Sequence, residues 1–298
     1  MADANTLSRG ALFPAQLVTD LFNTVKGKSS LAKLSNSTPV GFNGNQQFTF
    51  SLDNEVSIVG ENEKKVPGGA TLTPVTVIPF KFEYGARVSD EFMYASEEAK
   101  IDILRAFSEG FSAKLAKGFD IAAMHGINPR TGTASTVVGT NHFDAKVTQK
   151  VTLGTGATVD DDMESAIALV DAAEYDVNGA AISPAFRASL AALKTTDGSK
   201  IYPDLAWGSQ PSSINGLPIS VNSTVAKALA GDTSDAVIVG DFSAFKWGYA
   251  KEIPLRVIEY GDPDNTGVDL AGSNQVYLRA EAYIGWGILV PEAFSIVE

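Results

Sequence analysis

Few residues of this sequence have the types and spacing that catalysis requires. Ser30 and Lys33 stand three residues apart, as the nucleophile and the lysine of penicillin-recognising enzymes do. Those enzymes also need Ser-Asp-Asn and Lys-Thr-Gly elements, whereas the nearest strings here are SDE at 89–91 and KTT at 194–196. The sequence contains neither the G-x-S-x-G string of lipases nor the phosphate-binding P-loop string. We therefore interpret the match at Ser30 as chance.

Two further groups carry metal-ligating residue types. The segment from Asp262 to Gly267 begins like a calcium-binding EF-hand loop, with oxygen ligands at positions 1, 3 and 5 and glycine at position 6. Position 12 is Ser273 rather than glutamate, and strands are predicted on both sides, so we interpret the segment as a polar loop, with cation binding as the alternative. The only histidines, His125 and His142, have no catalytic constellation nearby in the sequence and are interpreted as structural. The sequence thus predicts no catalytic residue, no metal site and no cofactor.

Composition and charge describe a folded protein without disulfides. Hydrophobic residues make up 44% of the 298 residues, charged residues 19%, and cysteine is absent, which excludes thiolate metal sites and cysteine nucleophiles. Most of the net charge of −12 lies after residue 120, where the sequence has 21 acidic and 11 basic side chains. A protein that grips nucleic acid directly usually shows a basic patch, and none is visible. No apolar run is long enough to span a membrane, and no secretory signal is apparent, which predicts a cytoplasmic product.

The N-terminal third combines a short helix with a long hairpin. Apolar residues at helical spacing predict an amphipathic helix over 14–25 that docks on another surface. Alternating patterns predict strands at 47–52 and 74–84, each with one buried and one wet face. The segment between them holds two lysines, three glycines and two prolines over 57–74, which is long for a hairpin loop. Either this arm lies on a neighbouring copy of the protein, or it folds over its own domain.

The remaining elements predict a mixed α+β architecture. A helical pattern runs from Ser89 to Met124, with Ser89 or Ser96 as its cap and Gly126 just beyond its end. A capping box at Asp161–Glu164 opens a second helix, and Ser183 caps a third one after a short buried strand. Later elements are a hairpin turn at 215–216, a buried strand at 236–242, and C-terminal strands KWGYA, LRVIEY and QVYLRAEAYIGWGILV. Residues 130–240 form a compact α/β lobe between two halves of another lobe.

The order of these features resembles a known family. The most telling strings are VGENEKKVP at 59–67, VSDEF at 88–92, GDFSAF at 240–245 and PEAF at 291–294. Together with the docking helix, the long helix and the inserted lobe, they are similar to the major capsid protein of tailed double-stranded DNA bacteriophages, of the Hong Kong 97 (HK-97) type. The resemblance extends over nearly the whole chain and rests on the collinear set rather than on one motif.

The resemblance implies a fold and a division of the chain. Residues 1–40 would be an N-terminal arm and 41–86 an extended loop. Residues 87–129 and 241–298 would form a peripheral domain with a long spine helix, and residues 130–240 an inserted α/β axial domain. The function implied is a non-enzymatic shell subunit in the virion, assembled in the host bacterial cytoplasm. It would form pentamers and hexamers of an icosahedral or prolate head that encloses double-stranded DNA without reading its sequence.

The resemblance also implies contact residues and partners. The tip of the extended loop would touch another subunit, and the loop near residue 264 would meet its copies around three-fold positions. Isopeptide cross-links occur in some relatives; we hypothesise that none form here, because a lysine at a loop tip is usually a solvated charge. The closeness of the predicted docking helix to Met1 implies a separate scaffolding protein, or none, and the resemblance adds a portal and, as an option, a decoration protein. The tip residues are Glu61, Glu63, Lys64, Lys65 and Pro67, the three-fold residues are Asp262, Asp264 and Asn265, and the cross-link candidates are Lys64, Lys65, Asn265 and Asn274.

Two other classes of protein stay open at this point. An encapsulin, a bacterial nanocompartment shell of the same fold, would hold a cargo enzyme instead of a genome. A hydrolase with an α/β lobe is the third reading, and the missing nucleophile motifs count against it.

Overall fold

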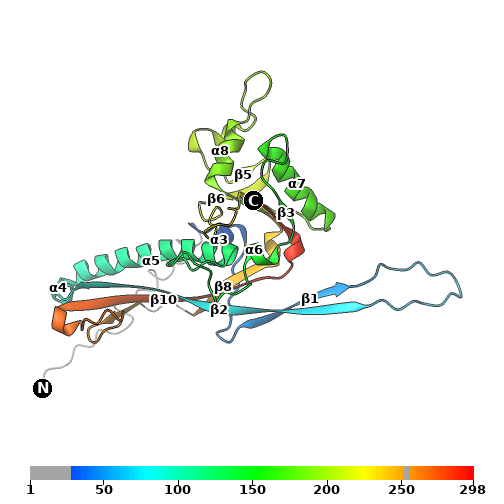
Figure 1. The fold of residues 1–298 in the computed structure, drawn as a ribbon. Helices are drawn as coiled ribbons and strands as arrows, with labels where there is room; N and C mark the ends of the chain where they lie inside the picture. Colours follow the sequence, from blue (N-terminus) through cyan, green and yellow to red (C-terminus); the bar gives the residue numbers. More distant parts are fainter. Residues whose placement is uncertain (1–27, 252–254) are drawn as a thin grey trace.

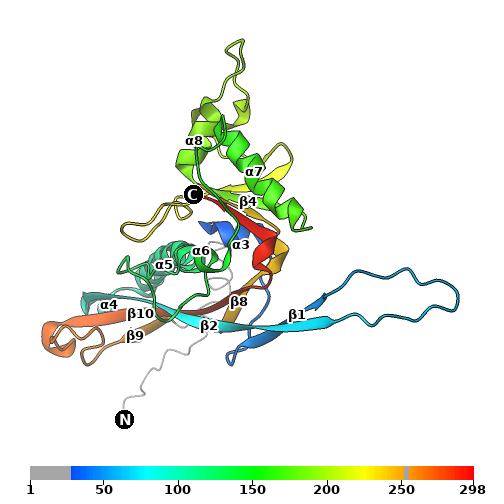
Figure 2. The same ribbon diagram turned by 45° about the vertical axis from the view of Figure 1, so that its right-hand side comes forward.

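The computed structural model describes residues 28–251 and 255–298 as two lobes and a long arm (Figure 1). A lower lobe combines a long helix with one sheet, and an upper lobe stands on it with a second sheet. The arm is a hairpin that runs out to one side, away from both lobes in both views (Figures 1 and 2). The helix predicted over 14–25 lies outside the described residues. Within the described part of the chain, no helix combines the length and apolar character needed to cross a membrane.

The lower sheet is built around two long antiparallel strands. Strand β10 pairs with β2 along twelve residues, from Gln275 opposite Ser89 to Trp286 opposite Ile78. On its other edge β10 pairs with β9 and then with β8, and β2 continues outward to pair with β1 in the arm. The predicted strand at 74–84 is thus the middle of a longer one. The strands are β1 (Asn45–Leu52), β2 (Ala70–Ser89), β8 (Phe245–Lys251), β9 (Leu255–Ile258) and β10 (Gln275–Ile288).

The long helix α5 (Glu97–His125) lies along this sheet (Figure 1). Of the two predicted caps, Ser96 is the one used, and its hydroxyl accepts a hydrogen bond from the Ala99 N–H at 3.3 Å. The stretch before it forms the separate short helix α4 (Glu91–Tyr94), because Ala95 is extended and interrupts the helical path. Gly126 ends α5 in the left-handed conformation, with φ +64°, as the sequence predicts.

An aromatic cluster holds α5 on the sheet. Phe119 is fully buried, and its ring centroid lies 5.3 Å from that of Trp247 on β8 and 5.6 Å from that of Trp286 on β10. Burying side chains of this size stabilises the fold by about 2–3 kcal/mol each. This core fixes the helix against the two strands that carry the C-terminal half of the lower lobe.

Two facing glycines let the chain cross the lower sheet. Gly248 on β8 is paired with Gly285 on β10. Residues 37–40 run over this point, where the Thr38 N–H donates to the Trp247 carbonyl at 2.8 Å. A Cβ at Gly248 would lie 1.6 Å from the Thr38 carbonyl oxygen, and one at Gly285 would lie 3.2 Å from a methyl carbon of Val40. Only glycine at position 248 leaves room for this crossing.

The upper lobe is a six-stranded mixed sheet in the order β3-β11-β7-β4-β6-β5. Every residue of β4, β7 and β11 is buried, as expected for strands covered on both faces. The helices α7 and α8 pack on this sheet (Figure 2). The strands are β3 (Lys150–Val151), β4 (Gly179–Ile182), β5 (Ser213–Ile214), β6 (Leu217–Val221), β7 (Val237–Gly240) and β11 (Phe294–Val297), and the helices are α3 (Ser30–Leu34), α6 (Phe143–Lys146), α7 (Val159–Ala172) and α8 (Pro184–Ala192). The short 3-10 helices are η1 (Pro203–Gly208), η2 (Phe242–Ala244), η3 (Ala271–Ser273) and η4 (Pro291–Ala293).

Two local predictions in the upper lobe are confirmed, and a third places the start of a helix three residues too late. Ser183 caps α8, and the turn at 215–216 joins β5 to β6, as predicted. The predicted capping box at Asp161–Glu164 is wrong: Thr158 is the N-cap of α7, and Asp161 takes the third helical position and accepts from the Thr158 N–H at 2.9 Å. The last strand, β11, lies in this upper sheet, although the resemblance implies that residues 241–298 belong to the other lobe.

Candidate assembly surface and buried polar clusters

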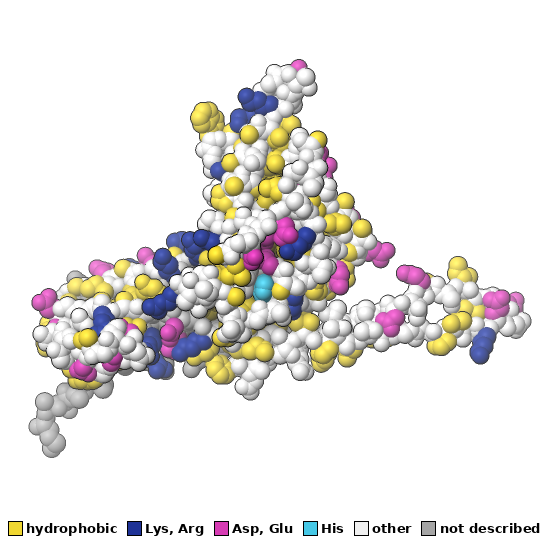
Figure 3. All heavy atoms as spheres, in the orientation of Figure 1, with side chains coloured by type: hydrophobic (Ala, Val, Ile, Leu, Met, Phe, Trp, Pro, Cys, Tyr) yellow, Lys and Arg dark blue, Asp and Glu magenta, His cyan; other side chains and the backbone are white. Residues whose placement is uncertain are grey.

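The arm exposes apolar side chains that its own chain does not cover. On β1, Phe48, Phe50 and Leu52 are 60%, 64% and 70% exposed. Leu72, opposite Phe50 on β2, is exposed as well. The alternation predicts that one face of this strand is buried. Within a single chain it is not, because among the described residues β2 is the only strand that pairs with β1. Yellow side chains along the arm mark this surface in Figure 3.

The tip of the arm has little structure of its own. Leu52 is the last residue of β1 and Ala70 the first of β2, and the Asp53 N–H donates to the Gly69 carbonyl at 3.1 Å to close the hairpin. Beyond that point a small turn forms, in which the Gly60 N–H donates to the Glu63 carboxylate at 3.1 Å. All the predicted tip residues are exposed, and none of the ion pairs found among the described residues involves one of them. They are Glu61, Glu63, Lys64, Lys65 and Pro67.

The loop predicted for three-fold contacts is organised by an arginine of the same chain. Arg87 on β2 donates to Asp264 through Nε at 2.9 Å and to Asp262 through Nη2 at 2.9 Å. It also reaches the Val268 carbonyl at 3.0 Å. The hydrogen bonds from Arg87 lower the pKa of Asp264 to about 2. The EF-hand-like carboxylates are therefore engaged by a guanidinium, which fits the interpretation as a polar loop.

The cross-link candidates lie at opposite ends of the chain. Asn265 and Asn274 both adopt left-handed backbone conformations, with φ +54° and +53°, in the segment that leads into β10. That segment lies at the far end of the lower lobe from the arm, as both views show (Figures 1 and 2). Lys64 and Lys65 could therefore approach these asparagines only on another copy of the chain.

A buried carboxylate that no local pattern predicts anchors the first described helix. Asp120, on α5, is fully buried and accepts hydrogen bonds from the Ser30 N–H at 2.8 Å and from Ser29, Thr224 and Asn222 side chains. Burial outweighs these donors and raises the pKa of Asp120 to about 6. Ser30 and Lys33, the chance enzyme-like pair, lie in this helix: the Ser30 hydroxyl accepts from Ser220, and Lys33 donates to the Ile219 carbonyl at 3.3 Å.

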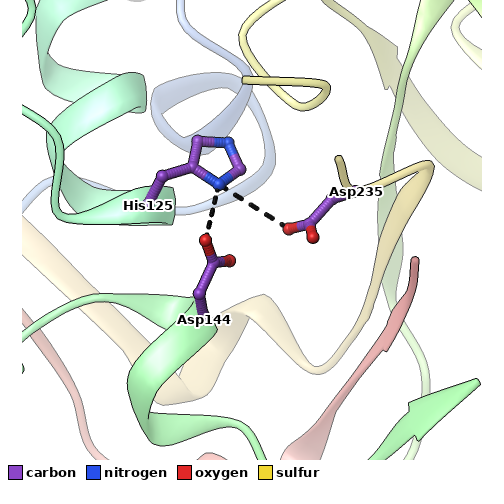
Figure 4. Close-up of side chains that lie close together, drawn as sticks. All are labelled: His125, Asp144 and Asp235. Carbon is purple, nitrogen blue, oxygen red and sulfur yellow. Dashed lines mark hydrogen bonds and ion pairs between the residues drawn. The ribbon is translucent and has the colours of Figure 1, made fainter. Parts of the chain in front are cut away.

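A second buried cluster surrounds His125, the last residue of α5 (Figure 4). Its Nδ1 lies 2.8 Å from Asp144 on α6 and 3.8 Å from Asp235, two residues before β7. Its Nε2 lies 2.9 Å from the Thr224 carbonyl oxygen. Burial, together with the neighbouring Asp144, raises the pKa of Asp235 to about 9. The interpretation of His125 as structural rather than catalytic stays a prediction. Asp144 and Asp235 come to it from 19 and 110 positions away, where local patterns carry no signal.

The described geometry offers no nucleophile aligned with a base in an open cleft. Its most prominent features are an uncovered apolar arm, a loop held by Arg87 at the opposite end, and polar clusters that join elements of both lobes. Exposed apolar surface of this extent is typical of interaction sites.

Comparison with known proteins identifies the family. The model of the phage capsid family matches residues 9–298, so the chain belongs to that family. Its fold is of the HK-97 type, as predicted. The chain is a capsid protein of the virion, which self-associates into a shell. A search of the curated proteins found no match.

Solved structures of high similarity support the assignment. A chain from Mycobacterium phage Ogopogo is 35% identical, with a TM-score of 0.76 and 91% of each chain covered. A chain from Gordonia phage Cozz is 31% identical, with a TM-score of 0.75, covering 91% of this chain and 86% of the other. The capsid of a native GTA particle shares the fold at 14% identity and a TM-score of 0.65, with 92% and 89% covered. The encapsulin reading is not favoured by these matches.

Proposed function

We propose that this chain is the major building unit of a double-stranded DNA phage head and that its arm lies across the neighbouring subunit in each ring. One chain with small changes of bend between its lobes would form both pentamers and hexamers, which close the shell. The observation that carries the proposal is the row of exposed apolar side chains on β1, which a second copy of the chain would cover.

Elementary energetics favour a covered arm. An isolated two-stranded hairpin is marginally stable in water, because it has no surface against which to bury its apolar side chains. Covering a phenylalanine or leucine side chain stabilises by about 1.5–3 kcal/mol. Three such side chains on β1, repeated in every subunit, would add several kcal/mol to each contact.

The charge of the chain agrees with a container rather than a nucleic-acid binder. Each chain carries a net charge of −12, so we expect the shell to enclose DNA without sequence-specific contacts. We propose that its role is structural and non-enzymatic. The loop that Arg87 holds around Asp264 would contribute contacts near three-fold positions. The resemblance also predicts scaffolding, portal and decoration partners and assembly in the host cytoplasm, and these stay predictions.

Two neighbouring substitutions test the role of the arm. Phe50→Asp places a charge on the exposed apolar row, whereas Ser51→Asp places the same charge one residue away on an exposed polar position. We expect the Ser51→Asp protein to assemble into closed shells and the Phe50→Asp protein to stay in small oligomers or monomers. Negative-stain electron microscopy and sedimentation velocity of the full chain measure this directly.

Circular dichroism of both variants separates assembly from folding. Because Phe50 contacts solvent in the single chain, its substitution leaves the folded subunit intact, and both variants should give the wild-type spectrum. Shells formed equally well by both variants would contradict the proposal that the arm joins subunits. Purified wild-type shells that hold protein cargo instead of nucleic acid would contradict the head function.

A further inference from the structure

Three potential metal ligands converge between the lobes. His125 comes from the end of α5, Asp144 from α6, and Asp235 from the segment just before β7 (Figure 4). One ligand atom of each lies within 4.8 Å of the other two. The three side chains belong to distant parts of the sequence, so their meeting is a product of the tertiary fold rather than of a local turn.

The hydrogen bonds leave this cluster incomplete. A backbone carbonyl only accepts hydrogen bonds, so the Nε2 of His125 at 2.9 Å from the Thr224 oxygen carries a hydrogen. A neutral imidazole then presents its Nδ1 lone pair to two carboxylates. A proton on Nδ1 would satisfy Asp144 at 2.8 Å, but the Oδ2 of Asp235, 3.8 Å away, would stay without a hydrogen-bond partner.

The orphaned oxygen is itself deeply buried. The Asp235 side chain is only 3% exposed, and its Oδ2, which faces the imidazole, has no hydrogen-bond partner; the Oδ1 of Asp144 lacks one as well. Buried carboxylate oxygens are nearly always paired or bound to a metal, because leaving them unpaired is costly. Lys150, a nearby cation, is engaged by Glu298 at 2.7 Å.

We propose that His125, Asp144 and Asp235 form a binding site for a divalent transition-metal cation such as Zn²⁺. One imidazole nitrogen and two carboxylate oxygens are ligands that Zn²⁺ accepts, and the hydrogen bond from Nε2 to a backbone carbonyl is the usual support of a metal-bound histidine. Binding of the ion would release the proton that the buried Asp235 holds, and two carboxylates with a neutral imidazole would then balance the charge of the divalent ion inside the protein.

The spacing and access of the cluster fit such an ion. Ligands at about 2.1 Å in a tetrahedral site lie about 3.4 Å from one another, and the observed separations of 2.8 and 3.8 Å lie on either side of that value. Asp144 is 29% exposed, so the site opens to solvent on that side and leaves a position for water. The bound ion would tie the end of the spine helix to the upper sheet, across the junction where the lobes meet.

Metal binding by the full-length protein tests this inference. After treatment with a chelator and desalting, the protein is titrated with Zn²⁺ by isothermal calorimetry, and bound metal is counted by elemental analysis. We expect about one ion per chain. Asp235→Asn and His125→Gln should each weaken binding at least tenfold, because each removes a ligand.

A matched control excludes binding elsewhere on this acidic protein. Asp197→Asn removes an exposed carboxylate in a loop of the upper lobe. This variant should bind Zn²⁺ as the wild type does. Failure of the wild type to bind one ion, or equal binding by Asp235→Asn and the wild type, would overturn the proposal.

A spectroscopic readout on the wild type does not depend on whether the variants fold. X-ray absorption of the Zn²⁺-loaded protein should show a single imidazole with the remaining ligands oxygen. Two imidazoles, or none, would place the ion elsewhere and reject the site.

Discussion

At the scale of single residues, buried carboxylates join elements that the sequence separates widely. Asp120 accepts hydrogen bonds from two segments that are distant in the sequence, near residue 30 and near residue 224. Arg87 likewise joins distant segments near the surface, where it donates hydrogen bonds to Asp262 and Asp264. Neither role was predicted, because a lone charged residue in a helix or strand pattern looks the same whether its partner is water or a distant side chain.

The titration of Asp120 gives a pH dependence with a defined sign. Its pKa is about 6 in the folded chain, above its ordinary value of 3.8, so the folded state binds this proton more tightly than the unfolded state does. Protonated Asp120 therefore contributes to the free energy of unfolding at low pH, and this contribution is lost as the pH rises toward 6. Between pH 4 and pH 7 the wild type should lose about 2–3 kcal/mol of stability relative to Asp120→Asn.

Urea unfolding at the two pH values measures this difference. A Phe50→Asp background keeps subunits apart, so that assembly does not mask the stability of the single chain. Asp197→Asn, which removes an exposed carboxylate, should show no such pH dependence relative to the wild type. A wild type that gains stability relative to Asp120→Asn as the pH rises would mean that the donors around Asp120, and not its burial, dominate.

At the scale of elements, close backbone approach decides which glycines matter. Gly248→Ala would bring a methyl group onto the Thr38 carbonyl, and the backbone there cannot yield without breaking its hydrogen bonds to β8. We expect a loss of more than 2 kcal/mol in unfolding free energy and release of residues 37–40 from the sheet. Hydrogen exchange at the Thr38 and Val40 amides reports the release.

A glycine in the spine helix serves as the contrasting case. Gly110 lies inside α5 with nothing within 4 Å of where its Cβ would be. Gly110→Ala should therefore stabilise the chain by about 0.5–1 kcal/mol, because alanine is the better helix former. Equal effects of the two substitutions would show that crowding at Gly248 is relieved by movement of the crossing segment.

At the scale of the whole molecule, local sequence patterns predict the helices and strands better than they predict which of these elements pack together. The hairpin, the spine helix with its Ser96 and Gly126 ends, and the Ser183 cap all follow from signals within a few residues. The sequence could not place β11 in the upper sheet, because an apolar strand fits either lobe equally well. Likewise, alternation in β1 indicated a face to be buried but not which molecule would bury it.

The last prediction concerns covalent links between subunits. The resemblance implies that a cross-linking lysine needs a buried glutamate beside it, which the sequence alone does not identify. Among the residues whose exposure the structure describes, Glu281 is the buried glutamate. Its carboxylate is bound by Lys81 at 2.8 Å, and this hydrogen bond lowers its pKa. A carboxylate held in this way is a poor base for a second lysine arriving from another subunit, so we propose that no cross-link forms.

Boiling purified shells in detergent distinguishes the outcomes. We expect a single band near 31.4 kDa, the mass of one chain. A ladder of multiples would contradict the proposal. Its loss in a Lys64→Arg, Lys65→Arg double variant, which keeps both charges, would then assign the bond to the arm tip, and its loss in Asn265→Asp or Asn274→Asp would identify the acceptor.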